Sequence, residues 1–144
     1  EPYRRQRQMC IRDRVKVDQV CLGSCTNGRL EDLEEAAKIL KGRHIAEDLK
    51  FIVAPASASI MEEAVKRGWI QTFVEAGALV TPPYCSFCEG RTMALMGDGE
   101  VMLGTNNRNF LGRFGSAKAK AYLASPAVAA ATAVKGVITD PAHL

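Results

Sequence analysis

The sequence has 144 residues, of which 47% are hydrophobic and 6% aromatic, a composition typical of one soluble globular domain. It contains neither an apolar stretch of membrane-spanning length nor the apolar core of a secretory signal. The formal charge is +3, but residues 1–14 carry all of it, and the other residues balance 14 Lys and Arg against 14 Asp and Glu. A general basic surface for nucleic acids is therefore excluded over residues 15–144, and we expect a cytoplasmic protein without membrane or nucleic-acid partners.

Residues 1–14 contain five Arg and show neither helical nor strand periodicity. We interpret them as a non-native leader that resembles translated assembly scar, with an Arg-rich transit segment as the alternative. Cys10 lies in this leader and is left out of the fold prediction. The domain is predicted over residues 15–144.

The first predicted strand is the apolar run 17–22. A helix is predicted over residues 30–40, where apolar residues recur at spacings of three and four. Thr26 or Asn27 is the expected N-cap of this helix, and Gly42 is its expected terminator.

A second strand is predicted over residues 51–54. The capping box Ser59-x-x-Glu62 then predicts a helix that stops at Gly68. A further helical face runs over residues 69–77. A third short strand, residues 78–81, precedes two prolines and a C-x-x-C motif.

The second half of the sequence predicts a strand at residues 101–103 and a helix over residues 126–135. Ser125 is the expected N-cap of that helix, Pro126 its first residue and Gly136 its terminator. A short final strand is predicted at residues 137–138.

Strands that alternate with helices predict an α/β fold, in three layers, with a parallel sheet and helices on both faces. In such sheets, ligands bind beyond the carboxyl ends of the strands. Three loops follow predicted strands and carry polar or sulfur side chains: residues 23–27, 82–90 and 104–115. We expect these loops to converge at one edge of the sheet.

Cys85 and Cys88 form the C-x-x-C motif, which is compatible with half a zinc site, half an iron–sulfur site or a redox disulfide. A zinc ribbon needs a second pair of ligands. Cys10 and Cys21 do not have that spacing, and the two histidines are isolated. An odd number of cysteines, five in all, favours metal or redox chemistry over a disulfide framework.

Cys25 lies between a predicted strand and a predicted helix, where free backbone N–H groups and the helix dipole favour a thiolate. The alternative is a buried, inert cysteine. Three converging thiolates would match a cubane cluster in which one iron has no protein ligand and acts as a Lewis acid.

The third loop contains Asn107, Arg108 and Arg113. An asparagine can hydrogen-bond a thiolate or a substrate oxygen, and arginines suit the two-pronged recognition of carboxylates. The alternative is a solvated polar loop.

Four motifs occur in this order: GSCTNGRLEDL, the C-x-x-C, TNNRNFLGRFG and YLASPAVAAATAVKGVITDP. Together they resemble the aconitase superfamily over roughly residues 17–141, in particular its branch of 3-isopropylmalate dehydratase large subunits and homoaconitases. The resemblance implies a [4Fe–4S] cluster held by Cys25, Cys85 and Cys88. It also implies that Asn107 supports the cluster and that Arg108 and Arg113 bind a substrate carboxylate.

The implied activity is a hydro-lyase reaction on a malate-like acid, above all 3-isopropylmalate in leucine biosynthesis, with homoaconitase, aconitase and dimethylmalate dehydratase as alternatives. The family's acid–base residues precede the first motif and are missing from this sequence. Its swivelling domain is expected as a C-terminal extension or a separate small subunit. We therefore expect a fragment that is inactive alone.

A zinc or redox C-x-x-C module is the alternative class of function. RNA binding, known in some relatives, has no support from the charge of the sequence.

Two departures from the family pattern concern the substrate. Ser86 and Phe87 stand between the later cysteines, where relatives often have Gly-Pro or a small residue. Gly104-Thr105-Asn106-Asn107 replaces the usual Ser-Thr/Ser-Asn before Arg108. Neither departure removes a cluster ligand, but both leave the substrate open.

Overall fold

The computed structural model describes residues 15–23, 28–82, 97–105 and 120–144. Its strands form one five-stranded sheet in the order β3-β2-β1-β4-β5, and every neighbouring pair is parallel. The strands are β1 (Gln19–Gly23), β2 (Lys50–Ala54), β3 (Leu79–Val80), β4 (Val101–Gly104) and β5 (Lys120–Leu123). The helices are α3 (Leu30–Leu40), α4 (Ala58–Lys66), α5 (Trp69–Ala76) and α6 (Pro126–Lys135), followed by the 3-10 turn η2 (Pro141–His143). The predicted α/β fold with a parallel sheet is confirmed.

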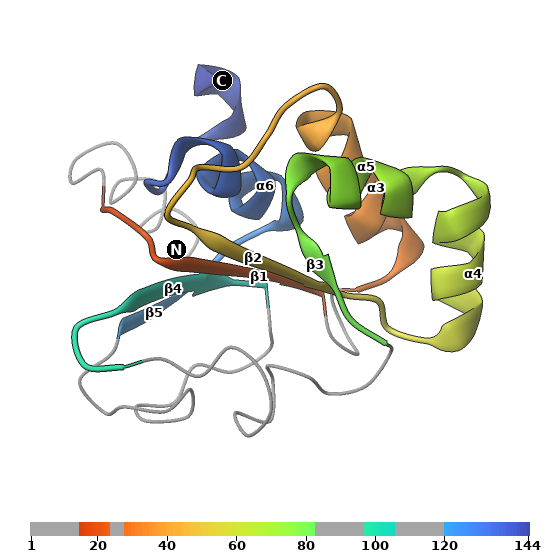
Figure 1. Cartoon of the computed structure of the whole chain (residues 1–144), viewed down its shortest axis with the longest axis horizontal. Coiled ribbons are helices and arrows are strands. Elements are labelled where there is room, and N and C mark those ends of the chain that lie inside the picture. The colour runs from red at the N-terminus through yellow and green to blue at the C-terminus, as the bar shows by residue number, and fades with distance from the viewer. Residues whose placement is uncertain (1–14, 24–27, 83–96, 106–119) are drawn as a thin grey trace.

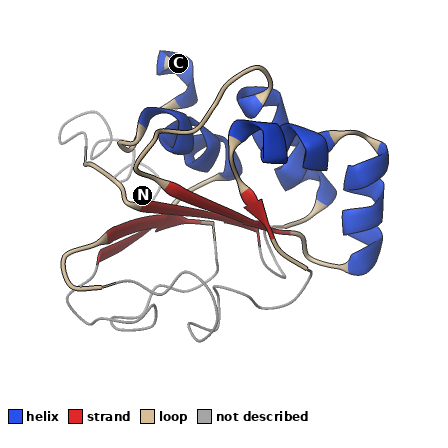
Figure 2. Cartoon of the chain, viewed as in Figure 1, coloured by secondary structure: helices blue, strands red, loops and turns tan. Residues whose placement is uncertain are grey.

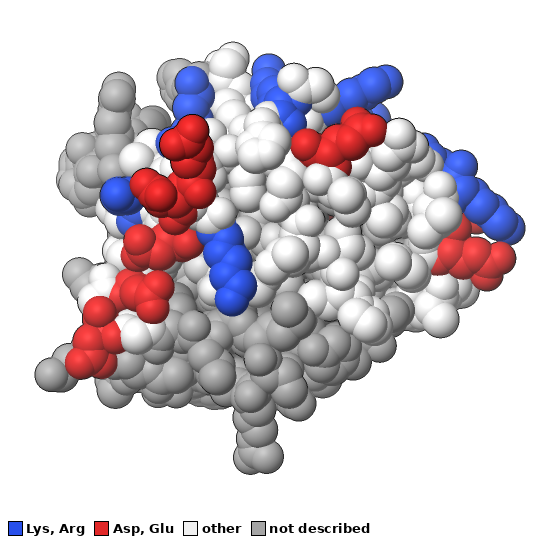
Figure 3. Space-filling view, in the orientation of Figure 1, with Lys and Arg blue, Asp and Glu red and all other residues white. Residues whose placement is uncertain are grey.

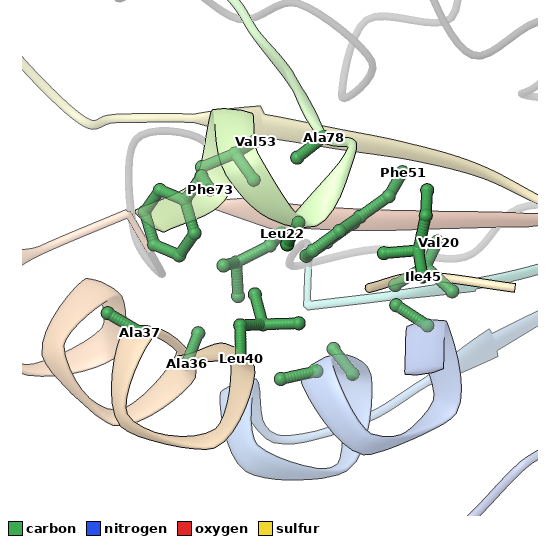
Figure 4. Close-up of a cluster of buried hydrophobic side chains, with 14 of the residues drawn as sticks. Val20, Leu22, Ala36, Ala37, Leu40, Ile45, Phe51, Val53, Phe73 and Ala78 are labelled. Atoms are coloured by element: carbon green, nitrogen blue, oxygen red, sulfur yellow. The ribbon is translucent and has the colours of Figure 1, made fainter. Parts of the chain in front are cut away.

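Helices α3, α5 and α6 lie on one side of the sheet, and α4 stands beside α5 at the end of this layer (Figures 1 and 2). Side chains alternate between the two faces of a strand, and Val20 and Leu22 of β1 join the core beneath the helices. Figure 4 shows Leu22 and Phe51 of the sheet close to Leu40 of α3. Small alanines on α3 and α6 let these helices approach each other closely.

The other face of the sheet is buried as well. Cys21, Ile52 and Met102 have exposed fractions of 0% and belong to strands β1, β2 and β4, but they lie outside the core beneath the helices. No helix of the described segments lies on this face (Figure 2). The burial of the three side chains shows that this face is covered, and the predicted second layer of helices stays a prediction.

The helix ends explain which boundaries the sequence predicts well. Helix α6 begins after Ser125, whose Oγ accepts a hydrogen bond from the Val128 N–H at 3.3 Å, and it ends at Gly136 with a φ of 82°. Both signals were predicted and are confirmed. The predicted span of α3 is also confirmed.

Two predicted helix caps are wrong. The N-cap of α3 is Arg29, neither Thr26 nor Asn27, and its N–H donates to the Asp32 carboxylate at 3.3 Å. The N-cap of α4 is Ser57 and not Ser59, because the Ser57 Oγ accepts from the Ile60 N–H at 3.2 Å. Partial burial raises the pKa of Asp32, and its hydrogen bond from the Arg29 backbone opposes that shift.

Two predictions at the C-terminal end also need correction. Strand β5 was not predicted, and it forms beside β4 as an edge strand. The predicted strand at residues 137–138 is only an isolated antiparallel bridge between Val137 and Lys16. Tertiary pairing decides the structure of such short segments.

Charged side chains of both signs occur on the face shown in Figure 3. Three exposed ion pairs join residues four apart on α3 and on α4 with its C-cap Arg67: Glu34 with Lys38, Glu62 with Lys66, and Glu63 with Arg67. Each such pair stabilises a helix by only about 0.2–0.5 kcal/mol. In the part of the chain that is described, no helix has the length and apolar character to cross a membrane.

The leader lies outside the described residues, and its non-native origin stays a prediction. The described chain starts at Val15, whose carbonyl oxygen accepts from the Ile138 N–H at 2.9 Å. We expect deletion of residues 1–14 to leave the melting temperature nearly unchanged, because the pattern of these residues predicts no packing element. Thermal unfolding of the shortened and complete chains measures this, and a marked fall would identify the leader as native structure.

Candidate functional site

Three strands end at the same edge of the sheet, directly before the three segments that carry the predicted site residues. Strands β1, β3 and β4 share one direction, and they end at Gly23, Val80 and Gly104. Their carboxyl ends lie on the same side of the sheet in Figure 1. The prediction that the three loops follow parallel strands is confirmed.

The predicted site residues themselves lie outside the described residues, so their positions and roles stay predictions. They are Cys25, Cys85, Cys88, Asn107, Arg108 and Arg113, together with Asn27.

The lengths of chain are compatible with one common site. Cys25 follows the end of β1 by two residues, and Cys85 follows the end of β3 by five. Strands β1 and β3 are separated by β2 alone, which corresponds to about 10 Å, and five extended residues span up to about 17 Å. Sulfur ligands from both ends can therefore meet, as a cluster with three cysteine ligands requires.

Gly23 makes a close backbone contact at the end of β1. Its φ is +114°, a conformation that residues with a Cβ rarely adopt. A Cβ at this position would overlap the carbonyl oxygen of Ala54 in β2 and lie 2.8 Å from the Ala54 carbonyl carbon. Glycine therefore allows β1 to leave the sheet tightly against β2, two residues before Cys25.

Hydrogen bonds fix the backbone on both sides of residues 24–27. The Gly23 N–H donates to the Thr105 Oγ1 at 2.9 Å, and the Ala56 N–H donates to the Gly28 carbonyl oxygen at 3.0 Å. Thr105 has an exposed fraction of only 2%, and Gly28 is buried. The start and end of the Cys25 segment are thus tied to the neighbouring strand ends of β4 and β2.

The end of β3 is anchored in a similar way. The Thr81 N–H donates to the Val53 carbonyl oxygen at 2.9 Å, and the Thr81 hydroxyl donates to the Pro82 carbonyl oxygen at 3.3 Å. Thr81 and Thr105 were not predicted to anchor this edge of the sheet. The sequence signal that both share is a threonine directly after a strand and before a segment with candidate ligands.

Cys21 has the properties of a packing residue. Its Sγ lies 3.6 Å from the Met102 Sδ, and its side chain is fully buried. Burial raises the pKa of the Cys21 thiol, with the charge of Lys50 as a smaller opposing effect, so the thiol stays protonated at neutral pH. Its burial against Met102 supports the prediction that Cys21 lies outside the ligand set.

The described residues form no second metal site, and their cavity lies away from this edge of the sheet. No group of three His, Cys, Asp or Glu side chains in these segments is placed to hold a metal ion. A cavity of about 720 Å³ lies between α3 and α5, with Lys41, Arg43 and Trp69 among its lining residues. It is at the C-terminal end of α3, whereas the Cys25 segment precedes the N-terminal end of that helix.

Comparison with known proteins gives consistent matches. The family model described as "Aconitase family (aconitate hydratase)" matches residues 3–136, a range that includes most of the leader. The 3-isopropylmalate dehydratase large subunit of Aliarcobacter butzleri is 52% identical over 134 residues, which are 93% of this chain and 32% of the relative. Large subunit 1 of Thermotoga maritima is 54% identical over 90% of this chain and 31% of the relative, and that of Archaeoglobus fulgidus is 56% identical over 88% and 30%. The chain spans about a third of the length of these relatives.

Proposed function

Because this chain belongs to the aconitase family, we propose that it is the cluster-binding part of the large subunit of a 3-isopropylmalate dehydratase. One structural observation carries the proposal. Strands β1, β3 and β4 end at one sheet edge, and each is followed directly by a segment with one of the family's motifs. Ligands of parallel sheets bind at this edge.

In this proposal, Cys25, Cys85 and Cys88 hold a [4Fe–4S] cluster. The residues fit such a group because three thiolates leave one iron free, and the chain lengths from β1 and β3 allow the sulfurs to meet. When bound, the cluster supplies a Lewis acid for the hydroxyl group of the substrate. Cys21 is left out of the proposed ligand set because its side chain is fully buried against Met102.

The substrate side of the site is assigned to the segment after β4. Asn107 supports the cluster environment, and Arg108 and Arg113 bind a substrate carboxylate through two-pronged hydrogen bonds. The identity of about half of the aligned residues to 3-isopropylmalate dehydratase large subunits favours 3-isopropylmalate, and hence leucine biosynthesis, over the substrates of homoaconitase, aconitase or dimethylmalate dehydratase.

The complete enzyme needs more than this chain. The relatives are named large subunits, and the chain spans about a third of them. We propose that the acid–base residues lie in the remaining part and that a small subunit completes the site. The chain alone then has no dehydratase activity, and the complete enzyme works in the cytoplasm.

Anaerobic reconstitution with ferrous iron and sulfide tests the proposal. We expect the chain to take up iron and sulfide and to develop the broad visible absorption of an iron–sulfur protein. A zinc or redox module using only Cys85 and Cys88 would stay colourless, with zinc bound or a disulfide formed. A colourless product would overturn the proposed function.

Replacing Arg113 with Lys separates substrate binding from cluster binding. In the complete enzyme we expect an unchanged cluster spectrum and a fall in kcat/KM of at least about 100-fold, because a point charge cannot reproduce a two-pronged contact with a carboxylate. Steady-state kinetics and the absorption spectrum of the same preparation measure both quantities. If the variant instead lost part of its cluster, and the turnover number of the molecules that keep a cluster were unchanged, Arg113 would have a structural role.

A further inference from the structure

At the end of β1, a side-chain oxygen accepts a hydrogen bond from the backbone, in place of a carbonyl oxygen of the neighbouring strand. The backbone pairing of β1 with β4 covers Gln19, Val20 and Cys21. Its last pair joins Cys21 to Gly104, the final residue of β4. Gly23 lies two residues further on, and its buried N–H donates to the Thr105 Oγ1 at 2.9 Å. A buried backbone N–H requires an acceptor, and here a hydroxyl supplies it.

Thr105 is itself held firmly. Its N–H donates to the Cys21 carbonyl oxygen at 3.1 Å, so its backbone and its side chain both bind β1. Its exposed fraction is 2%, and the bond joins residues 82 positions apart in the sequence. A buried bond with a fixed acceptor restricts the direction in which the chain leaves β1.

The far end of the same segment has a second fixed point. The Gly28 carbonyl oxygen accepts from the Ala56 N–H at 3.0 Å, just beyond the end of β2. Four residues, 24–27, lie between the two fixed points, and Cys25 is the second of them. A cluster ligand needs a sulfur held at a set place, and mutation of the residues that orient metal ligands typically costs about 10–100-fold in metal affinity.

We propose that Thr105 is a positioning residue for Cys25. Its hydroxyl holds the Gly23 N–H and thereby fixes the start of the segment that presents the Cys25 thiolate to iron. Because Thr105 lies two residues before Asn107, the same bond ties the cysteine segment to the segment assigned to the substrate. This inference rests on the proposed function, since it takes Cys25 as a ligand.

The test compares two threonines with matched roles. Thr132 on α6 is fully buried, and its Oγ1 accepts from the Thr139 N–H at 3.1 Å, a bond of the same kind as that of Thr105. Thr132 lies near Gly136, whose carbonyl oxygen accepts from the Val17 N–H before the start of β1, and so belongs to the opposite edge of the sheet. Valine has nearly the shape of threonine but no hydroxyl, so T105V and T132V each remove one buried acceptor.

The complete chain and the variants T105V, T105S and T132V are reconstituted anaerobically with ferrous iron and sulfide. Iron and sulfide per folded protein, visible circular dichroism and the rate of cluster loss to an iron chelator are measured. We expect T105V to lose its cluster about 10–100 times faster than the wild-type chain and to have altered visible circular dichroism. T105S keeps the hydroxyl and should behave as the wild type, and T132V should keep the wild-type rate although its bond is also lost.

The outcomes separate the two proposals. Equal rates of cluster loss for T105V and T132V, with a coloured wild-type chain, would overturn the role of Thr105 and leave the proposed function standing. A colourless wild-type chain would overturn both. If T105V does not fold, T105A takes its place, and failure of both to fold would make Thr105 a structural residue and overturn its positioning role.

Discussion

Replacing Gly23 with Ala is expected to lower the free energy of unfolding of the chain by at least about 3 kcal/mol. The new Cβ would overlap the Ala54 carbonyl oxygen, and the φ of +114° adds conformational strain. Because β1 is the central strand of the sheet, the backbone has little room to shift. Urea denaturation followed by far-UV circular dichroism measures the loss.

Gly42 supplies the matched control for this substitution. It also has a positive φ, +76°, but a Cβ built there meets no atom within 4 Å. Gly42→Ala should therefore cost only the conformational penalty of about 1–2 kcal/mol. Equal losses for the two variants would show that the contact with Ala54 contributes nothing.

Replacing Cys25 with Ala in the complete enzyme is expected to abolish dehydratase activity. The variant has only two cysteine ligands for a cubane cluster that needs three. The cluster should therefore be lost, and the visible absorption should disappear together with turnover. Absorption spectra, iron analysis and activity of the anaerobically reconstituted variant measure this. Retention of a full cluster would remove Cys25 from the ligand set.

Cys21→Ala is the control, because it removes a sulfur four residues away in the sequence that faces Met102. This variant should keep the cluster and its activity. We expect it to lose only about 1–2 kcal/mol of stability, since a buried sulfur is removed from a filled core. Loss of the cluster in the folded Cys21→Ala variant would contradict the assignment of Cys21 to packing.

The sequence predicts best those elements whose ends carry their own signals. Helix α6 has Ser125 before it and Gly136 after it, and α5 ends at Gly77 with a φ of +103°. Such signals act within a few residues and are visible in one sequence. Strands β1 and β2 were predictable because their residues are almost all apolar, as central strands of a parallel sheet are.

The errors arise where partners distant in the sequence decide the structure. Strand β5 contains the residues KAYL, which have no strong strand pattern, and it depends on β4 for its pairing. Ser57 and Ser59 are both plausible N-caps by sequence, and only the hydrogen bond to Ile60 distinguishes them. Neither choice can be made from local pattern alone.

The candidate site also has features that the local sequence predicts and features that depend on distant partners. The order of the motifs and their places after strands are readable from sequence, and the parallel sheet confirms that β1, β3 and β4 end together. The contact of Gly23 with Ala54 and its bond to Thr105 join residues 31 and 82 positions apart. No local rule predicts those partners, because the register of the sheet creates them.

The strand order also sets when the site can form during synthesis. Among the described elements, β1 is synthesised before its neighbour β4, which follows some 80 residues later, after β2, β3 and helices α3, α4 and α5. At about 5–20 residues per second, the Cys25 segment waits for several seconds before Thr105 has even been made. Pairings between such distant segments are also slow to form. Under the proposed function, the nascent cysteines therefore pass through an interval in which they are exposed to oxidants and free metal ions, and we expect delivery of iron and sulfide to be productive only after β4 has docked.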